Sequence, residues 1–170
     1  MIRPLTSQQA KMAQEIINAA AQAYQGVIPA DCWQEPYMPL EELLAELAAG
    51  VKFWAYEADG RLVGVMGRQA VQDVTLIRHA YVLPQAQRRG IGARLLDRLR
   101  RDVASPMLVG TWAAAWWAVR FYEKHGFRLV TPADKDRLLR TYWTISDRQI
   151  ETSVVLADER WFGRQGPQAA

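Results

Sequence analysis

The alternation of apolar and polar positions divides the chain into helical and extended segments. Apolar residues recur at helical spacing near the N-terminus and again from Ile91 to Val103, whereas the region 51–83 is rich in β-forming residues. A turn at Ala58-Asp59-Gly60 predicts a hairpin between two strands of that region. The predicted strands cover 2–5, 51–57, 61–69, 73–83, 107–110, 127–131 and 149–157. The predicted helices cover 7–24, 40–49, 91–103 and 113–124, with a helical turn at 134–142.

The order of these elements predicts one α/β (α+β) domain over residues 1–160. Hairpins beside strand-helix-strand units imply a mixed, mostly antiparallel central sheet of about seven strands with helices on both faces. The last strand is predicted from four alternating residues that would share one face, Ile150, Thr152, Val154 and Leu156. Residues 161–170 form a predicted disordered tail, because the chain from Gly163 onward is rich in Gln, Gly and Pro.

Composition narrows the classes of function. Half of the 170 residues are apolar and 23% are charged, which is typical of a folded soluble domain. No apolar run is long enough for a membrane helix, no N-terminal pattern indicates secretion, and the single Cys32 cannot form an internal disulfide, so we expect a cytoplasmic protein. A net charge of +3 over the whole chain disfavours nucleic acid as a partner. The two histidines are far apart and the chain has one cysteine, so these residues do not have the spacing of metal ligands. The apolar last strand and the Trp-rich segments would suit a homodimer.

A turn with two glycines and two arginines links a predicted strand to a predicted helix, in the segment Gln87-Arg88-Arg89-Gly90-Ile91-Gly92-Ala93. Backbone N–H groups in such a turn point to one place at the positive end of the helix dipole, and this geometry binds phosphate. The segment is not a dinucleotide fingerprint, because Leu95 stands where a third glycine is needed, and the chain has no P-loop Gly-Lys pair. A glycine-rich turn with solvated arginines is the structural alternative.

A second segment, Ala118–Phe127, follows about 30 residues downstream and combines Ala, Phe-Tyr and a closing Gly-Phe. In the first segment, Gln87 is followed by two free positions, then Gly90, one free position and Gly92. Together the two segments resemble the motifs of the GNAT superfamily of acyl-CoA-dependent N-acetyltransferases, most sharply over 62–129. The resemblance implies the family fold, a sheet splayed at the cofactor site, and acetyl-CoA as the acetyl donor.

The resemblance also assigns cofactor contacts. It puts pantetheine beside the third long strand and the pyrophosphate on the amides from Arg88 to Ala93. The implied cofactor-binding residues are Ala80, Tyr81, Val82, Gln87, Arg88, Arg89, Gly90, Ile91, Gly92, Ala93 and Tyr122. One position departs from the family pattern: Ala115 stands where many members have Asn, so that polar contact is absent or replaced.

Acetyl transfer to an amine needs a neutral nucleophile, a donor for the oxyanion and an acid for the leaving thiolate. The resemblance assigns the acid to Tyr122 and the oxyanion contact to the backbone N–H of Val82. Because a phenol pKa of about 10 exceeds the ~8.5 of a thiol, donation from tyrosine requires tuning or concerted transfer. His79, on the strand beside the cofactor, is the candidate base, and a half-buried histidine bonded to a neighbour is the alternative.

The candidates for acceptor binding are Trp33, Glu35, Tyr37, Arg78 and Glu151. The first three lie in an aromatic loop that would form a pocket wall, since aromatic faces attract cationic amines. Arg78 would point away from His79 on a regular strand, although a bulge could turn it, and it would suit an acidic substrate. Glu151, on the last strand, and Glu35 are further candidate bases, with solvated surface carboxylates as the alternative.

These residues predict a cytoplasmic N-acetyltransferase that moves the acetyl group of acetyl-CoA to a primary amine by direct attack in a ternary complex. The alternative is a non-catalytic acyl-CoA-binding or sensing domain. A small-molecule amine, an antibiotic, a peptide and a protein lysine all stay open as acceptors, because loop sequences alone do not define a pocket. No metal, nucleic acid or membrane is expected to take part.

Overall fold

Strands and helices account for most of residues 1–164 and 166, which the computed structural model describes. The strands are β1 (Ile2–Pro4), β2 (Lys52–Ala58), β3 (Arg61–Val71), β4 (Val74–Val82), β5 (Met107–Trp112), β6 (Arg128–Leu129) and β7 (Ser153–Ala157). The α-helices are α1 (Ala10–Ala21), α2 (Leu40–Ala48), α3 (Ile91–Arg100), α4 (Trp116–Lys124), α5 (Pro132–Tyr142), α6 (Asp147–Thr152) and α7 (Glu159–Arg164). Four short 3₁₀ turns are η1 (Ser7–Gln9), η2 (Gln22–Tyr24), η3 (Ala30–Cys32) and η4 (Pro84–Ala86).

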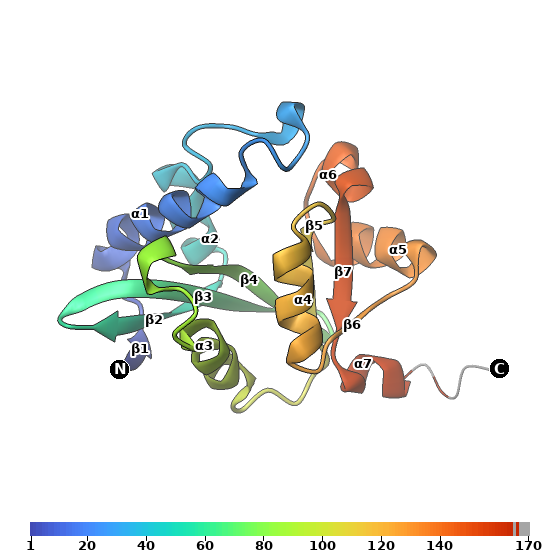
Figure 1. Cartoon of the computed structure of the whole chain (residues 1–170). Coiled ribbons are helices and arrows are strands. Elements are labelled where there is room, and N and C mark those ends of the chain that lie inside the picture. The colour runs from blue at the N-terminus through green and yellow to red at the C-terminus, as the bar shows by residue number, and fades with distance from the viewer. Residues whose placement is uncertain (165, 167–170) are drawn as a thin grey trace.

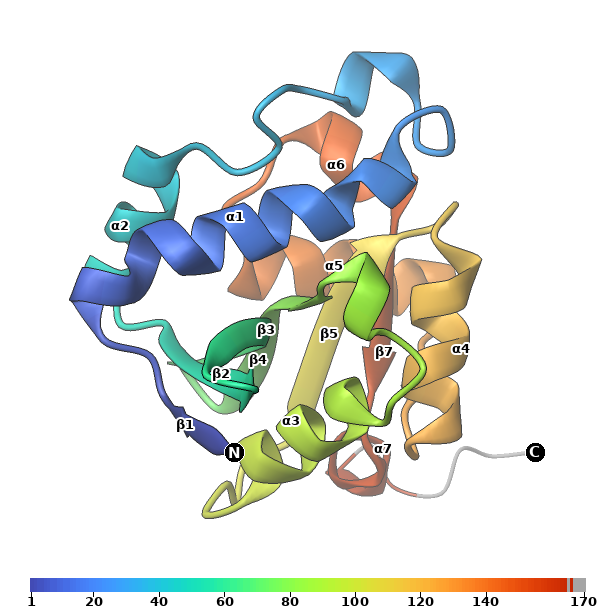
Figure 2. The ribbon, with the colours of Figure 1, turned by 60° about the vertical axis from the view of Figure 1, so that its left-hand side comes forward.

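The strands form one mixed sheet in the order β1-β2-β3-β4-β5-β7-β6 (Figure 1). Neighbouring strands run antiparallel except β4 and β5, which are parallel. The ladder between β4 and β5 covers only Thr75–Ile77 and Met107–Val109, although both strands continue beyond it. The sheet therefore opens between these two strands (Figure 2), and the predicted fold class is confirmed.

Helices cover both faces of the sheet because successive strand residues point in opposite directions. On β2, Phe53 packs with α1 and α2, whereas its neighbour Trp54 packs with α3. On the other side of the opening, Leu108 of β5 packs with α5 and α6, and the next residue, Val109, belongs to the cluster that includes α4. Each buried side chain of this size stabilises the fold by about 1.5–3 kcal/mol. In the described part of the chain, no helix has both the length and the apolar content needed to span a membrane.

The last predicted strand is too long. Residues 149–152 belong to α6, and β7 begins only at Ser153. A capping box starts this helix: the Gln149 amide donates to the Ser146 hydroxyl at 3.2 Å, and the Ser146 amide donates to the Gln149 side chain at 3.1 Å. Ile150 is buried as a helix residue, so the apolar alternation over 150–156 joins the end of a helix to a strand.

The predicted tail is wrong for residues 161–164, which are part of α7. Trp161 is buried in the same cluster as Val74 and Leu108, so a large aromatic side chain attaches this helix to the sheet. Residues 165 and 167–170, which complete the predicted tail, lie outside the described residues.

The segment between α1 and α2 is irregular, as predicted, and α1 fixes its end. The Met38 amide donates to Asn18 Oδ1 at 2.7 Å, and Asn18 Nδ2 donates to the Met38 carbonyl at 3.0 Å. Gln14 donates to the same carbonyl at 3.1 Å. Because Met38 is only 2% exposed, these bonds satisfy backbone groups that water does not reach.

We expect Asn18→Ala to lower the free energy of unfolding by about 1–3 kcal/mol, because it leaves the buried Met38 amide without an acceptor. Urea denaturation followed by circular dichroism measures this change. Glu15→Ala, at an exposed position of α1, is the control and should stay within about 0.5 kcal/mol of the wild type. Equal losses in the two variants would contradict the role given to Asn18.

Candidate active site

The turn before α3 has the geometry of an anion site. The chain leaves β4, makes the η4 turn and enters α3 at Ile91. Arg88 and Gly90 both have left-handed backbone conformations, with φ of +62° and +74°. The Arg94 amide donates to the Gly90 carbonyl at 3.1 Å, so the three amides before it form the first turn of the helix, where no intrahelical acceptor exists. These N–H groups offer a place for a phosphate.

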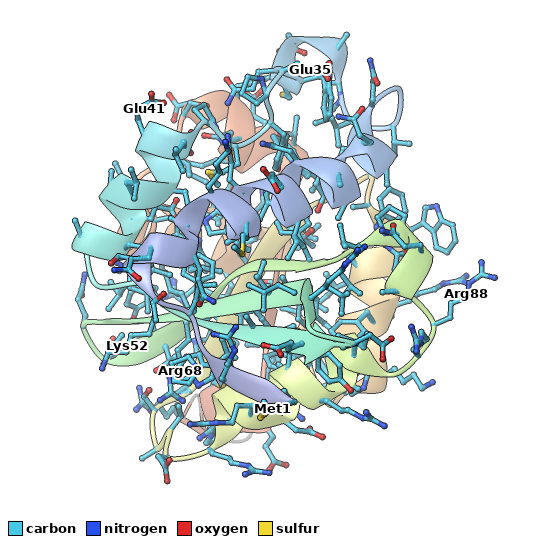
Figure 3. All side chains as sticks on the ribbon, turned by 90° about the vertical axis from the view of Figure 1, so that its left-hand side faces the viewer. Met1, Glu35, Glu41, Lys52, Arg68 and Arg88 are labelled. Carbon is cyan, nitrogen blue, oxygen red and sulfur yellow. The ribbon has the colours of Figure 1, made fainter. Side chains whose placement is uncertain are left out.

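A cavity of about 680 Å³, the larger cavity, lies between this turn and α4. The predicted cofactor-binding residues that line it are Ala80, Tyr81, Val82, Gln87, Arg88, Gly90, Ile91, Gly92, Ala93 and Tyr122. Arg89 is not among the lining residues. A Cβ at Gly92 would stand 3.3 Å from the Phe121 ring, so glycine permits the close approach of α3 and α4. Arg88 extends outward from the turn (Figure 3).

Tyr122 of α4 is 4% exposed and lines the larger cavity. Its ring meets Phe121 and Phe127 edge to face, with centroids 5.1 and 5.7 Å away. Burial, together with the nearby Tyr24, raises the pKa of the Tyr122 hydroxyl well above its ordinary value. The phenol therefore keeps its proton throughout the neutral pH range and is a hydrogen-bond donor.

A β-bulge in β4 redirects two side chains. Between the pairs Gly67–Arg78 and Val65–Tyr81, β4 has two residues where β3 has one. His79 begins the bulge with a left-handed φ of +51°. As a result, Arg78 and His79 both reach toward α2. The sequence left two cases open for Arg78, and the strand has the bulge that turns this side chain to the same side as His79.

Glu46 of α2 contacts both of these side chains. Arg78 Nη2 donates to Glu46 Oε1 at 2.9 Å, and His79 Nε2 forms a hydrogen bond with Oε2. The His79 ring also stacks on Phe53, with centroids 5.9 Å apart. Burial alone would raise the pKa of Glu46, but the hydrogen bond with His79 and the adjacent positive charges hold that pKa below its usual range. One ionised carboxylate thus fixes the positions of both side chains.

A second cavity, of about 490 Å³, lies on the α2 side of β4 and is called the smaller cavity. Tyr37, Arg78 and His79 line it, together with Glu46. Trp33 stacks on Tyr37, with centroids 5.9 Å apart and planes at 24°, and so supports the wall of the cavity from outside. The structure therefore brings together three of the residues singled out in the sequence.

Besides Trp33, two predicted acceptor residues, Glu35 and Glu151, do not line either cavity. Glu35 lies at the exposed outer part of the loop between α1 and α2 (Figure 3). Glu151 lies on α6 rather than on a strand, and its carboxylate pairs with Arg148 at 3.4 Å near the surface. For both residues, the structure agrees with the alternative of a solvated carboxylate.

Tyr24 and Tyr81 line both cavities and so form their shared boundary, here called the junction. Their centroids are 6.3 Å apart, and Tyr37 lies 5.4 and 6.5 Å from them. Burial, with Tyr37 close by, raises the pKa of Tyr24 to about 12. Burial also raises the pKa of Tyr81. Uncharged hydroxyl groups therefore line the junction, with His79 in the smaller cavity and Tyr122 in the larger.

Comparison with models of known protein families shows to which family this chain belongs. A family model described as the acetyltransferase (GNAT) domain matches residues 7–141. The chain belongs to the GNAT acetyltransferase family. It is an acyl-CoA-dependent N-acetyltransferase, as the two sequence motifs indicated.

Individual GNAT proteins are similar to this chain, two in fold and one in sequence. The PaiA N-acetyltransferase of Thermoplasma acidophilum, solved in complex with coenzyme A, is 17% identical, with a TM-score of 0.69 over 93% of this chain and 97% of that chain. A GNAT-family acetyltransferase from Staphylococcus aureus Mu50 is 19% identical, with a TM-score of 0.69 over the same shares. The peptidyl-lysine N-acetyltransferase YiaC of Escherichia coli (strain K12) is 28% identical over 104 residues, 61% of this chain and 68% of that protein.

This GNAT chain differs from the family pattern at the start of α4. Ala115 is fully buried and offers no polar side chain to a cofactor. The next two residues, Trp116 and Trp117, line the larger cavity, and Trp116 is 60% exposed. An exposed indole beside the cavity presents a flat apolar face to whatever binds there.

Two acidic residues of this GNAT domain were missed by sequence reasoning. Glu42 and Glu46 both line the smaller cavity, but their four-residue spacing on a predicted amphipathic helix is also typical of a solvated face. Glu46 contacts His79 from 33 positions away in the chain, and no local pattern carries that information.

We expect Gly90→Val to weaken acetyl-CoA binding about tenfold. A β-branched residue disfavours the left-handed φ by roughly 1–2 kcal/mol, so the free turn adopts another conformation, which binding must reverse. Gly90→Asn, whose side chain tolerates this conformation, should stay within about threefold of the wild type. A Cβ at position 90 meets no atom within 4 Å, so side-chain volume does not distinguish the variants. Isothermal titration measures both affinities, and equal weakening would count against the conformational argument.

Proposed function

We propose that this protein transfers the acetyl group of acetyl-CoA to a primary amine by direct attack in a ternary complex. The observation that carries the proposal is the meeting of the two cavities at Tyr24 and Tyr81. Two ligands that enter from opposite sides would have their reacting ends at this junction. The larger cavity would take the donor and the smaller cavity the acceptor.

Several features of the larger cavity support acetyl-CoA as the donor. The amides before α3 suit the pyrophosphate, and Arg88 adds positive charge beside them. The β4–β5 ladder stops at Ile77, so the backbone groups of β4 near Ala80 and Val82 have no partner on β5 and suit an extended pantetheine chain. The coenzyme A bound to the similar PaiA N-acetyltransferase supports this class of donor.

In the proposed reaction, the amine nitrogen attacks the thioester carbonyl carbon, a C–N bond forms, and the C–S bond breaks. His79 would accept the proton that the amine loses. Its bond to Glu46 would hold the ring in place, which makes Glu46 a positioning residue. The backbone N–H of Val82 would donate to the developing oxyanion. A peptidyl-lysine N-acetyltransferase among the relatives supports a primary amine as the acceptor.

Tyr122 would act on the leaving sulfur. Because burial raises the pKa of its hydroxyl, complete proton transfer to a free thiolate, whose pKa is about 8.5, would be uphill. We therefore propose that Tyr122 donates a hydrogen bond to the sulfur while the C–S bond breaks, so that charge on sulfur is stabilised as it develops.

We expect Tyr122→Phe to lower kcat about 100-fold, which is typical of the loss of an acid or hydrogen-bond donor at the reacting atom. The affinity for acetyl-CoA should change less than about threefold, because the ring remains in place. Steady-state thiol release and isothermal titration measure the two effects. Tyr142→Phe, outside both cavities, is the control. A Tyr122→Phe enzyme with wild-type kcat would remove this residue from the mechanism.

We expect His79→Asn to lower kcat about 100-fold at neutral pH, because the acceptor for the amine proton is lost. Asn is chosen because it tolerates the left-handed φ at this position. Thiol release with a panel of primary amines measures kcat, and unchanged acetyl-CoA affinity shows that the variant is folded. Retention of kcat would leave His79 with a structural role only.

A non-catalytic acyl-CoA-binding domain predicts a different result for the wild type. Such a domain would bind acetyl-CoA in the calorimeter but release no thiol with any amine of the panel. That result would overturn the proposed transfer reaction while leaving the assignment of the larger cavity in place.

A further inference from the structure

The smaller cavity contains one carboxylate without a cationic partner. The charged or histidine side chains that line it are Asp31, Glu42, Glu46, Arg78, His79 and Arg148. Arg148 Nε contacts Asp31 Oδ2 at 2.8 Å, and Glu46 contacts both Arg78 and His79. Among the residues that the structure describes, no cationic side chain forms an ion pair with Glu42. The lining therefore carries a negative charge that a ligand can neutralise.

Glu42 lines the same cavity as Glu46 and Tyr37. It lies one helical turn before Glu46, so the two side chains share a face of α2. Burial is the main cause of the raised pKa of Tyr37, and the negative charge of Glu42 contributes to it. Glu42 and Tyr37 line the same cavity, and Tyr37 in turn lies 5.4 Å from Tyr24 at the junction of the cavities.

Aromatic side chains line the smaller cavity together with Glu42. Tyr24, Tyr37, Tyr81 and Trp112 all line the smaller cavity, and the Trp112 indole donates to the Tyr37 hydroxyl at 2.9 Å. Aromatic faces attract cations, and uncharged phenol oxygens accept hydrogen bonds from ammonium groups. A chain with a positive charge at its far end suits such a wall.

We propose that Glu42 binds a second cationic group of the acceptor, so that the enzyme prefers diamines to monoamines. This inference rests on the proposed function, because it requires the reacting amine at the junction near Tyr24 and Tyr81. The far ammonium group stays at Glu42 while the near amine reacts. The volume of about 490 Å³ is within the range of small-molecule sites.

An acidic acceptor suits this cavity less well. Arg78 is already bonded to Glu46 and, at 2.8 Å, to Gln69. Arg148 is held by Asp31 and Glu151. A carboxylate on the acceptor would have to break one of these contacts and would also meet the charge of Glu42.

The test compares three four-carbon amines that differ only at the far end: putrescine, n-butylamine and γ-aminobutyrate. We expect the kcat/KM of the wild type to be about tenfold higher for putrescine than for n-butylamine. Two equivalent amines in putrescine account for a factor of about two in this ratio, and the contact with Glu42 would account for the rest. γ-Aminobutyrate should be the poorest acceptor. Because the preference is electrostatic, it should shrink as salt is added.

Two neighbouring variants isolate the carboxylate. Glu42→Gln should reduce the putrescine to n-butylamine ratio to about two, the statistical value. Glu41→Gln should keep the wild-type ratio, because Glu41 (Figure 3) is exposed, as Glu42 is, but does not line the cavity. Glu42→Lys should reverse the preference between putrescine and γ-aminobutyrate. Equal acetyl-CoA affinity in all variants shows that each is folded.

The outcomes separate the two proposals. A wild-type ratio near two, or an unchanged ratio in Glu42→Gln, overturns the role of Glu42, and acetylation of n-butylamine in the same experiment still supports the proposed function. Binding of acetyl-CoA with no thiol release in the presence of any of the three amines overturns the role of Glu42. The proposed function itself is overturned only when no amine of the wider panel, lysine peptides included, gives thiol release.

Discussion

The short ladder between β4 and β5 is the constraint on which both cavities depend. Three residue pairs, from Thr75–Met107 to Ile77–Val109, hold the two halves of the sheet together. Buried side chains on both faces, such as Leu76 and Ile77, keep this short ladder closed. Beyond it the strands separate, and the backbone of β4 is available to a ligand. Since α3 follows β4 in the chain, the first turn of that helix begins at the edge of the same opening.

On the other side of the sheet, the bulge in β4 places the side chains that line the smaller cavity. One additional residue places Arg78 and His79 against the same carboxylate, Glu46, although they are adjacent in the strand. A regular strand would send one of them to each face. The left-handed backbone at His79 is a local cost, which the two contacts with Glu46 and the stacking on Phe53 offset.

Local patterns predicted most of the fold, because hydrophobic periodicity, turn residues and helix breakers act over a few residues. They failed at α6, where six helical residues are too few to show a helical period and the alternation of Ile150 with Val154 and Leu156 is typical of a strand. The turn before α3 could be recognised in the sequence because its glycines and arginines lie in one contiguous segment. Glu46 could not be recognised in the same way. Its role depends on a partner from another element and on a bulge that the spacing of side chains does not reveal.

Tyr24 and Tyr81 belong to the walls of both cavities, and this sharing has a thermodynamic consequence. Any shift of these rings that accompanies the binding of one ligand changes the space available to the other. Linkage requires the effect to be mutual: the factor by which the first ligand alters the affinity for the second equals the factor by which the second alters the affinity for the first. Both phenols are uncharged in the neutral range, and burial raises their pKa values further, so this coupling free energy arises from packing and hydrogen bonding rather than from titration.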